Sequence, residues 1–78
     1  MFFFHQANAR INDHVAADLK LDVSKVHSTI HKFGNTTSAT IPLGMWDGMQ
    51  AGKLKPGMLI ALTTFGAGFT WGTSLVRL

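Results

Sequence analysis

The chain opens on a continuously apolar segment, Phe2–Phe4, directly after Met1. Such a run is typical of a parallel strand that is covered on both faces. Asn8, a residue that caps helices, follows shortly afterwards. Behind it, three apolar residues recur at the four-residue spacing of one helical stripe. They are Ile11, Val15 and Leu19. We therefore predict a helix that runs to about Lys20, with this stripe in the core.

The middle of the chain contains a short alternating segment and a second helical stripe. Val26, Ser28 and Ile30 alternate with His27, Thr29 and His31, as the two faces of a short strand do. The cap-rich stretch 34–38 predicts a turn. After it, Ile41, Met45 and Met49 again step by four residues. A helix should therefore begin close to Pro42, since proline is tolerated in the first helical turn, and end near Gly52.

Two strands and a tight turn are predicted for the last part of the chain. Residues 58–65 form an apolar run with threonine and isoleucine, the pattern of a strand covered on both faces. Gly66-Ala67-Gly68 follows as a tight connection. From Phe69 onward apolar and small polar residues alternate, which predicts a final strand antiparallel to the previous one. The fold class is thus α/β, a mixed sheet with two helices and a final antiparallel strand pair.

Composition indicates a chain that needs a partner surface. Hydrophobic residues make up 46% of the 78 residues and charged residues only 14%, against about 25% charged in an average soluble domain. A tightly packed small domain is one interpretation. The interpretation we favour is a fragment or subunit whose apolar surface is covered by a homo-oligomer or another chain.

Charge and cysteine content exclude several classes of protein. The net charge is +3, but the basic residues are dispersed, so we expect no nucleic-acid partner. The opening run is too short for a signal-peptide core, and we expect no membrane span. The chain has no cysteine, which excludes a disulfide framework and is compatible with a cytoplasmic location.

Three segments carry a resemblance to a known family. They are His5-Gln6-Ala7-Asn8-Ala9-Arg10-Ile11, then Gly34-Asn35-Thr36-Thr37-Ser38-Ala39 with Ile41-Pro42 behind it, and Phe65-Gly66-Ala67-Gly68-Phe69-Thr70-Trp71-Gly72. Their order, spacing and content resemble the end of β-ketoacyl-acyl-carrier-protein synthase III, a thiolase-fold condensing enzyme. The resemblance covers residues 1–78 and implies a single partial domain, the C-terminal part of a thiolase-like half.

The resemblance implies a chemistry and two catalytic residues. Enzymes of this family transfer an acyl group from acyl-CoA to a cysteine and condense it with malonyl carried on acyl carrier protein, with loss of carbon dioxide and no cofactor. His5 and Asn35 match the family's catalytic histidine and asparagine. Two preorganised N–H donors that converge on the malonyl thioester oxygen stabilise the enolate that decarboxylation produces. Without the resemblance, His5 is a structural histidine and Asn35 an ordinary turn residue.

Four further residues match substrate-binding positions of the family. Ala67 takes the place of the middle glycine of a glycine triplet whose backbone N–H binds the acyl-thioester oxygen, and its β-carbon disfavours a positive φ and a close ligand approach. Asn8 and Arg10 match positions for CoA or phosphopantetheine and for docking of the carrier protein, with a helix cap and a solvated charge as the structural alternatives. Phe65 matches a phenylalanine packed against the catalytic pair, and a buried strand phenylalanine is the alternative.

Other catalytic arrangements lack support in the sequence. His27 and His31 lie four residues apart, but no third ligand is near, so we predict no metal site and expect both to be exposed or capping. The four aspartates form no close pair in an apolar setting, which argues against paired-carboxylate catalysis.

Three hypotheses are consistent with these patterns, and each has its own test. In the first, the chain is the C-terminal segment of a synthase and is inactive without a cysteine-bearing partner. In the second, it is a non-catalytic relic or a binding module of the same fold that self-associates. In the third, it is a module that binds CoA or the carrier protein through Arg10 and Asn8.

Overall fold

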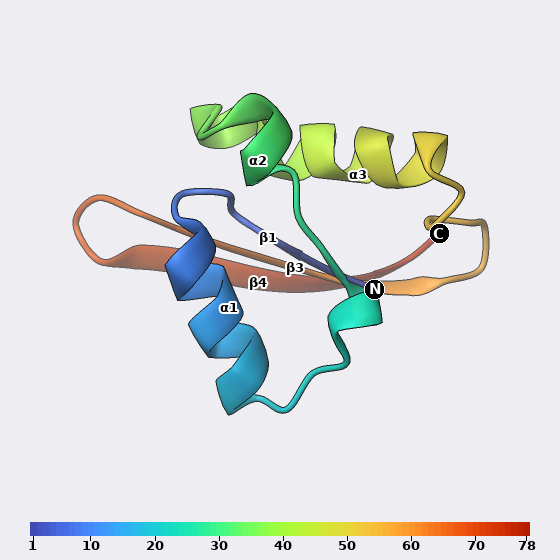
Figure 1. Cartoon of the computed structure of the whole chain (residues 1–78), viewed down its shortest axis with the longest axis horizontal. Helices are drawn as coiled ribbons and strands as arrows, with labels where there is room; N and C mark the ends of the chain where they lie inside the picture. The colour runs from blue at the N-terminus through green and yellow to red at the C-terminus, as the bar shows by residue number, and fades with distance from the viewer.

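A computed structural model describes all 78 residues of the chain. Its centre is one mixed sheet with the strand order β2-β1-β3-β4. The strands are β1 (Phe2–Phe4), β2 (Val26–His27), β3 (Leu59–Gly66) and β4 (Thr70–Arg77). The helices are α1 (Ala9–Asp18), α2 (Ile30–Phe33) and α3 (Thr40–Gln50), with single 3-10 turns at Val23–Lys25 and Thr37–Ala39. Figure 1 shows α1 on one side of the sheet and α2 and α3 on the other. The predicted α/β class is confirmed, with the one-turn α2 as an addition.

The opening phenylalanines form the central strand, as their pattern predicts. β1 pairs in parallel with β2 on one side and with β3 on the other, in a register that places Phe3 beside Leu62. Phe3 and Ile60 are fully buried and form the core together with Leu54. A central strand with a partner on each edge has its backbone groups in ladders, so β1 gives a rigid support to the segment that begins at His5.

The second helix begins where its proline requires. α3 starts at Thr40, so Pro42 stands in the first turn. Backbone N–H groups in the first turn have no partner inside the helix, so the missing N–H of proline costs no hydrogen bond there. The side of α3 that faces β1 carries small residues: a Cβ added to Gly44 would lie 3.5 Å from the Phe3 ring, and one added to Gly48 would lie 3.4 Å from it. The glycines lie on the buried side of α3; in the stripe with helical spacing, Met45 packs against the core while Met49 is half exposed.

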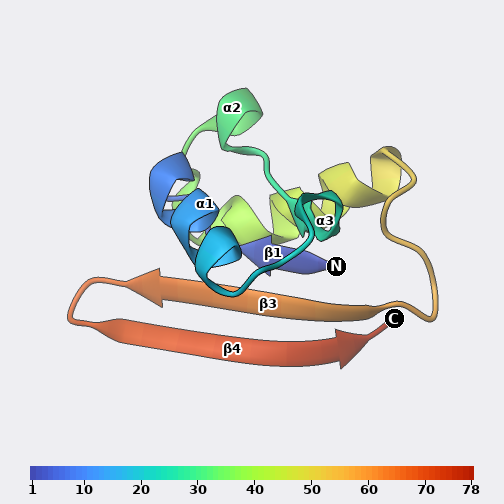
Figure 2. The same ribbon diagram turned by 60° about the horizontal axis from the view of Figure 1, so that its bottom comes forward.

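The C-terminal hairpin is also confirmed. β3 and β4 are antiparallel, with Phe65 opposite Trp71 and Gly66 opposite Thr70. The expectation that β3 is covered on both faces is wrong for this chain, since Ile60 is its only fully buried residue. Figure 2 shows the reason: the helices lie over β1 and β3, while β4 forms the outer edge with no element beyond it.

Two local predictions are corrected. Ile11 and Leu19 of the α1 stripe are 44% and 62% exposed, and the helix turns Asn12 and Ala16 inward instead. The strand predicted for residues 26–31 stops at His27. The N–H groups of Thr29 and Ile30, which a strand needs for its ladder, both donate to the side chain of Gln6, so the backbone turns into α2.

Much apolar surface remains outside the core. Only 13 of 78 residues are buried, and the exposed fractions of Phe69 and Trp71 on the hairpin are 93% and 79%. This agrees with the inference from composition that the chain has more apolar residues than its own core accommodates. No helix is both long and apolar enough to cross a membrane.

Candidate active site

An open hollow of about 830 Å³ lies where β1 and β3 end. In sheets of this kind, ligand sites form beyond the carboxyl ends of the parallel strands. The hollow brings together residues from four distant parts of the sequence: the segment after β1, the loop after α2, the start of α3 and the hairpin. Those of interest are His5, Asn35, Thr40, Phe65, Gly66 and Ala67. Four of the six predicted site residues thus share one cavity.

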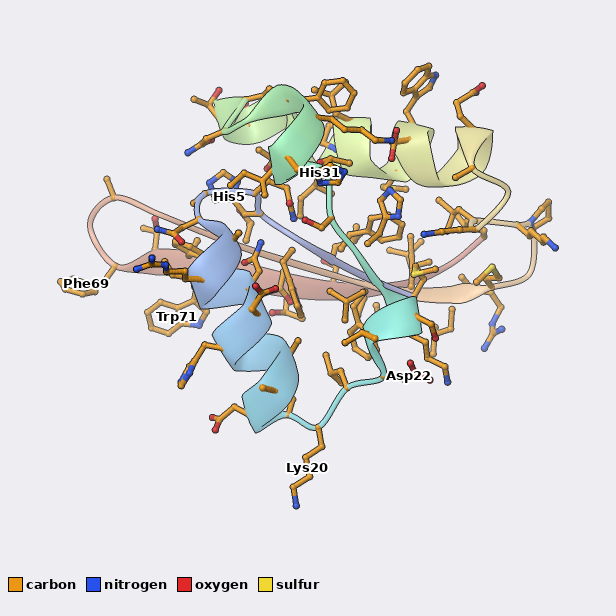
Figure 3. The ribbon with its side chains drawn as sticks, in the orientation of Figure 1. His5, Lys20, Asp22, His31, Phe69 and Trp71 are labelled. Atoms are coloured by element: carbon orange, nitrogen blue, oxygen red, sulfur yellow. The ribbon has the colours of Figure 1, made fainter.

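His5 is held by four contacts. Its backbone N–H extends the β1–β3 ladder by donating to Thr63 O at 2.8 Å, and its carbonyl accepts from the Asn12 side chain at 3.2 Å. Its ring lies edge-on to Phe65, with 5.5 Å between the ring centroids, a favourable geometry for aromatic pairs. Ring atom Nδ1 is 2.6 Å from Thr40 Oγ1. Only the Nε2 edge of the imidazole therefore remains to meet a ligand. Figure 3 shows His5 between the end of β1 and α2.

Asn35 follows a helix end that only glycine favours. α2 closes at Gly34, whose φ is +66°, a backbone conformation that costs other residues energy. Asn35 Oδ1 then accepts the N–H of Thr37 at 2.8 Å, the bond of an Asx turn. Because this bond fixes which end of the amide faces the backbone, the Nδ2 hydrogens are left as the polar group that Asn35 presents.

Gln6 connects the two candidate catalytic segments, and the sequence alone did not reveal it. The side chain is buried, its Nε2 donates to Phe4 O, and its Oε1 lies 3.1 Å from three donors. These donors are Ser28 Oγ, Thr29 N and Ile30 N. They include the first N–H groups of α2, which have no partner inside the helix. Gln6 thereby fixes the start of α2 relative to His5, and α2 leads to Asn35.

The hairpin turn is compatible with alanine in its middle. The residues with positive φ are Gly68, at +77°, and Phe69, at +55°, whereas Ala67 is not among them. Thr70 Oγ1 donates to Ala67 O at 3.0 Å and closes the turn. The strain expected at Ala67 is therefore absent from its backbone, and its β-carbon is the only departure from the glycine triplet at this position.

Asn8 and Arg10 lie outside the hollow. Asn8 Oδ1 accepts the N–H of Arg10 at 2.9 Å, so Asn8 caps α1 as its structural alternative predicts. The side chains of both residues are exposed. The structure therefore brings His5, Asn35, Phe65 and Ala67 together and leaves this pair on the adjoining surface.

A partly buried polar cluster joins α3 to β2 and α2. Asp47 Oδ2 is 2.8 Å from His27 Nε2, and Asp47 Oδ1 accepts from Lys32 Nζ at 2.8 Å. The hydrogen bond from Lys32, followed by that of His27, lowers the pKa of the Asp47 carboxyl below its ordinary value of 3.8. The expectation that His27 is exposed or capping is wrong, because Asp47 satisfies it in the interior; His31 is exposed as expected. No group of three histidine or acidic side chains is placed to hold a metal.

Comparison with known proteins gives a consistent result over the whole chain. The family model described as "3-Oxoacyl-[acyl-carrier-protein (ACP)] synthase III C terminal" matches residues 1–78. The β-ketoacyl-[acyl-carrier-protein] synthase III of Nitratidesulfovibrio vulgaris is 49% identical over 73 residues, which are 94% of this chain and 22% of that protein. The synthase of the same name from Campylobacter jejuni is 47% identical over 77 residues, 99% of this chain and 24% of that protein.

Solved structures agree with the sequence relatives. The crystal structure of 3-oxoacyl-[acyl-carrier-protein] synthase III from Aquifex aeolicus VF5 matches with a TM-score of 0.95 and 41% identity, over 100% of this chain and 25% of that one. The corresponding synthase from Thermus thermophilus matches with a TM-score of 0.96 and 36% identity, over 100% and 24%. The chain thus spans about a quarter of the length of the relatives that it matches.

Proposed function

Since the chain belongs to the 3-oxoacyl-[acyl-carrier-protein] synthase III family, we propose that it carries the decarboxylating half of a condensing-enzyme active site. In this proposal His5 and Asn35 bind the thioester oxygen of a malonyl group on acyl carrier protein. The donors are the Nε2–H of the imidazole and the Nδ2–H of the amide. The thioester is the substrate that the family's function in fatty-acid synthesis implies.

The proposed chemistry needs donors that are in place before the charge forms. When the bond between the malonyl carboxylate and its neighbouring carbon breaks, carbon dioxide leaves and the electron pair passes to the thioester as an enolate. The enolate carbon then attacks an acyl thioester, and the thiolate of that thioester leaves. Two fixed N–H groups stabilise the enolate oxygen more than the neutral carbonyl, which lowers the barrier to decarboxylation.

One observation carries the proposal: His5 and Asn35 line one hollow, and in each side chain the polar atom that is not the proposed donor is already hydrogen-bonded to the protein. Thr40 occupies Nδ1 of His5, and the Thr37 N–H occupies Oδ1 of Asn35. A structural histidine and a plain turn residue would explain one such bond each. They would not explain why both residues line a single cavity at the strand ends.

The acyl-carrying thiol has to come from elsewhere. The chain has no cysteine and spans about a quarter of its relatives, so we assign the nucleophile to a separate cysteine-bearing part of the synthase. Without that part the chain is inactive in condensation. The backbone N–H of Ala67 would then bind the acyl-thioester oxygen, and Phe65 would keep His5 away from water by packing on its ring.

The test is an assay of the assembled synthase, meaning this chain purified together with a cysteine-bearing N-terminal part of a synthase of this family. His5→Ala should lower malonyl decarboxylation by about 10²- to 10³-fold, the usual effect of removing one donor to a developing oxyanion. His31→Ala is the matched control, because His31 is exposed on α2 and lies outside the hollow; its rate should stay within about threefold of wild type. No association together with no malonyl-dependent condensation would remove the proposal.

Arg10 and Asn8 have a separate proposed part. A guanidinium forms bidentate bonds with phosphate or with acidic side chains, so we assign Arg10 to the phosphate end of CoA or phosphopantetheine or to the carrier protein. Titration of the chain with CoA and with acyl carrier protein, for wild type and Arg10→Ala, tests this assignment. Binding of neither molecule would reject it.

A second candidate function, a self-associating module without catalysis, is favoured by the exposed apolar residues of the hairpin. Covering such a surface is a common reason for homo-oligomers. Sedimentation equilibrium decides between the candidates. A stable homo-oligomer that lacks condensing activity even with the cysteine-bearing part present would favour this candidate, whereas a stable monomer would reject it.

A further inference from the structure

The nitrogen of His5 that the proposed chemistry leaves unused has a single protein partner, Thr40. The distance from Nδ1 to Oγ1 is 2.6 Å, short enough for a strong hydrogen bond. Thr40 is the first residue of α3 and is 2% exposed. Its hydroxyl is therefore shielded from water, and the direction of this one bond decides where the imidazole carries its proton.

The direction can be derived by counting donors. A neutral imidazole has one N–H and one unprotonated nitrogen, whereas a hydroxyl both donates and accepts. If Nδ1 carried the proton, it would donate to Oγ1, and the Thr40 hydroxyl hydrogen would need a different acceptor; His5 Nδ1 is the only hydrogen-bonding partner of this side chain. If the hydroxyl donates to Nδ1, every polar hydrogen of the pair is bonded. Buried polar groups in proteins are nearly always satisfied.

We propose that Thr40 is a positioning residue whose hydroxyl donates to Nδ1 of His5 and so keeps the imidazole in the tautomer that carries its proton on Nε2. This rests on the proposed function and deepens it, because the Nε2–H is the donor that the enolate needs. With the opposite tautomer, Nε2 would present a lone pair to the enolate oxygen and repel it. Tautomer control by a second residue is a known requirement for catalytic histidines.

The core keeps this contact in place. Phe3 and His5 are two residues apart on β1 and its extension, so their side chains lie on the same face of the sheet. α3 meets that face with Thr40, Gly44 and Gly48, one residue per turn; the two glycines meet the Phe3 ring and Thr40 meets His5. The packing that buries Phe3 therefore also sets the distance between Thr40 and His5.

Nitrogen NMR of the ¹⁵N-histidine-labelled chain tests the proposal directly. Its readout is the protonation of each ring nitrogen, at a pH where the imidazole is neutral, and His5→Gln assigns the signals. We expect wild type and Thr40→Ser to show a protonated Nε2 and an unprotonated, hydrogen-bonded Nδ1. Thr40→Val keeps the shape but removes the hydroxyl, and His5 should then exchange between two tautomers. A protonated Nδ1 in wild type, or an unchanged spectrum in Thr40→Val, would overturn the proposal. If Thr40→Val does not fold, the wild-type and Thr40→Ser spectra still test the proposal, because a protonated Nδ1 of His5 in either would overturn it.

Kinetics of the assembled synthase provide the second readout. Thr40→Val should lower kcat for malonyl decarboxylation by about 10-fold with KM nearly unchanged, because the affected bond matters most in the transition state. Thr40→Ser should recover most of the rate. Tautomers as expected with no decarboxylation in wild type would reject the proposed function and leave the Thr40–His5 bond established. Full activity of Thr40→Val would reject only the role of Thr40.

Discussion

Replacement of Asn35 by aspartate separates the two bonds that this side chain makes. The Oδ1 atom of Asn35 accepts the Thr37 N–H at 2.8 Å and closes the Asx turn. An aspartate has the same shape and accepts the same bond, but it has no N–H to donate. Asn35→Asp therefore preserves the turn bond, removes the N–H donor and adds a negative charge in its place.

The expected effect is large on catalysis and small on folding. Loss of one donor to a developing oxyanion lowers the rate by about 10²- to 10³-fold, which corresponds to about 2.7–4 kcal/mol in the barrier. The new carboxylate repels the enolate as well, so about 10²-fold is the smallest reduction that we expect. Because Asn35 is exposed and the turn bond remains, the free energy of unfolding should change by less than about 0.5 kcal/mol.

The assay is the release of carbon dioxide from malonyl carried on acyl carrier protein by the assembled synthase, together with urea unfolding of the chain. Asn35→Ala serves as the comparison, since it removes both the turn bond and the donor and should lower stability as well as rate. An Asn35→Asp enzyme within about threefold of wild type would show that the amide N–H does not bind the enolate. Equal losses of stability in both variants would show that the turn had not been preserved.

Two further predictions concern the buried polar groups. Gln6→Met leaves the Thr29 and Ile30 N–H groups without their acceptor and should lower the free energy of unfolding by about 2–4 kcal/mol. The control Gln50→Met, on the exposed end of α3, should change the free energy of unfolding by less than about 0.5 kcal/mol. Equal urea midpoints for the two variants would contradict the bridging role of Gln6. The Lys32 and His27 bonds depress the pKa of Asp47 below 3.8 in the folded chain, so the stability that this carboxylate contributes is complete above about pH 5 and is lost as the pH falls through 3.8 and below. The difference in unfolding free energy between wild type and Asp47→Asn should therefore shrink on acidification, with Asp18→Asn correcting for the lost charge; a difference independent of pH would refute this explanation.

Strands and their partners could be predicted where a single local pattern decides the outcome. The continuous apolar run of β1 favours a buried strand and the alternation after Phe69 favours an outer one, so β1, β3 and β4 appear close to their predicted bounds. Pro42 likewise has only the first helical turn available to it. In each of these places backbone chemistry alone restricts the choice.

Burial could not be predicted in the same way, because it depends on what lies opposite. The stripe of α1 that contains Ile11 and Leu19 is the more apolar side of the helix, yet this chain turns Asn12 inward. The amide of Asn12 has a backbone partner in His5 O, which makes its burial tolerable. The apolar stripe remains outside because no other part of these 78 residues covers it.

Some residues of the candidate site could be predicted from the sequence and others could not. His5 and Asn35 could be selected from the sequence only through the family's motifs, since a lone histidine and a turn asparagine are common in structural roles. Gln6 belongs to the same motif as His5, but its bridging role depends on hydrogen-bond donors more than 20 residues away in the sequence. Thr40 and Asp47 gave no signal at all, because their partners lie in other elements and their roles consist of single contacts.

The position of α3 connects the core with the proposed chemistry. The four-residue stripe of α3 contains Ile41 and Met45, and the row beside it, Thr40, Gly44 and Gly48, is the one that meets β1. Small residues in this row let the helix approach the Phe3 ring to van der Waals distance, and that close approach is what brings the Thr40 hydroxyl to 2.6 Å from His5. Bulky residues at the glycines would move the helix outward and break the bond to the imidazole before they abolished the fold. The glycines therefore matter to the site through geometry alone, although neither of them touches the hollow.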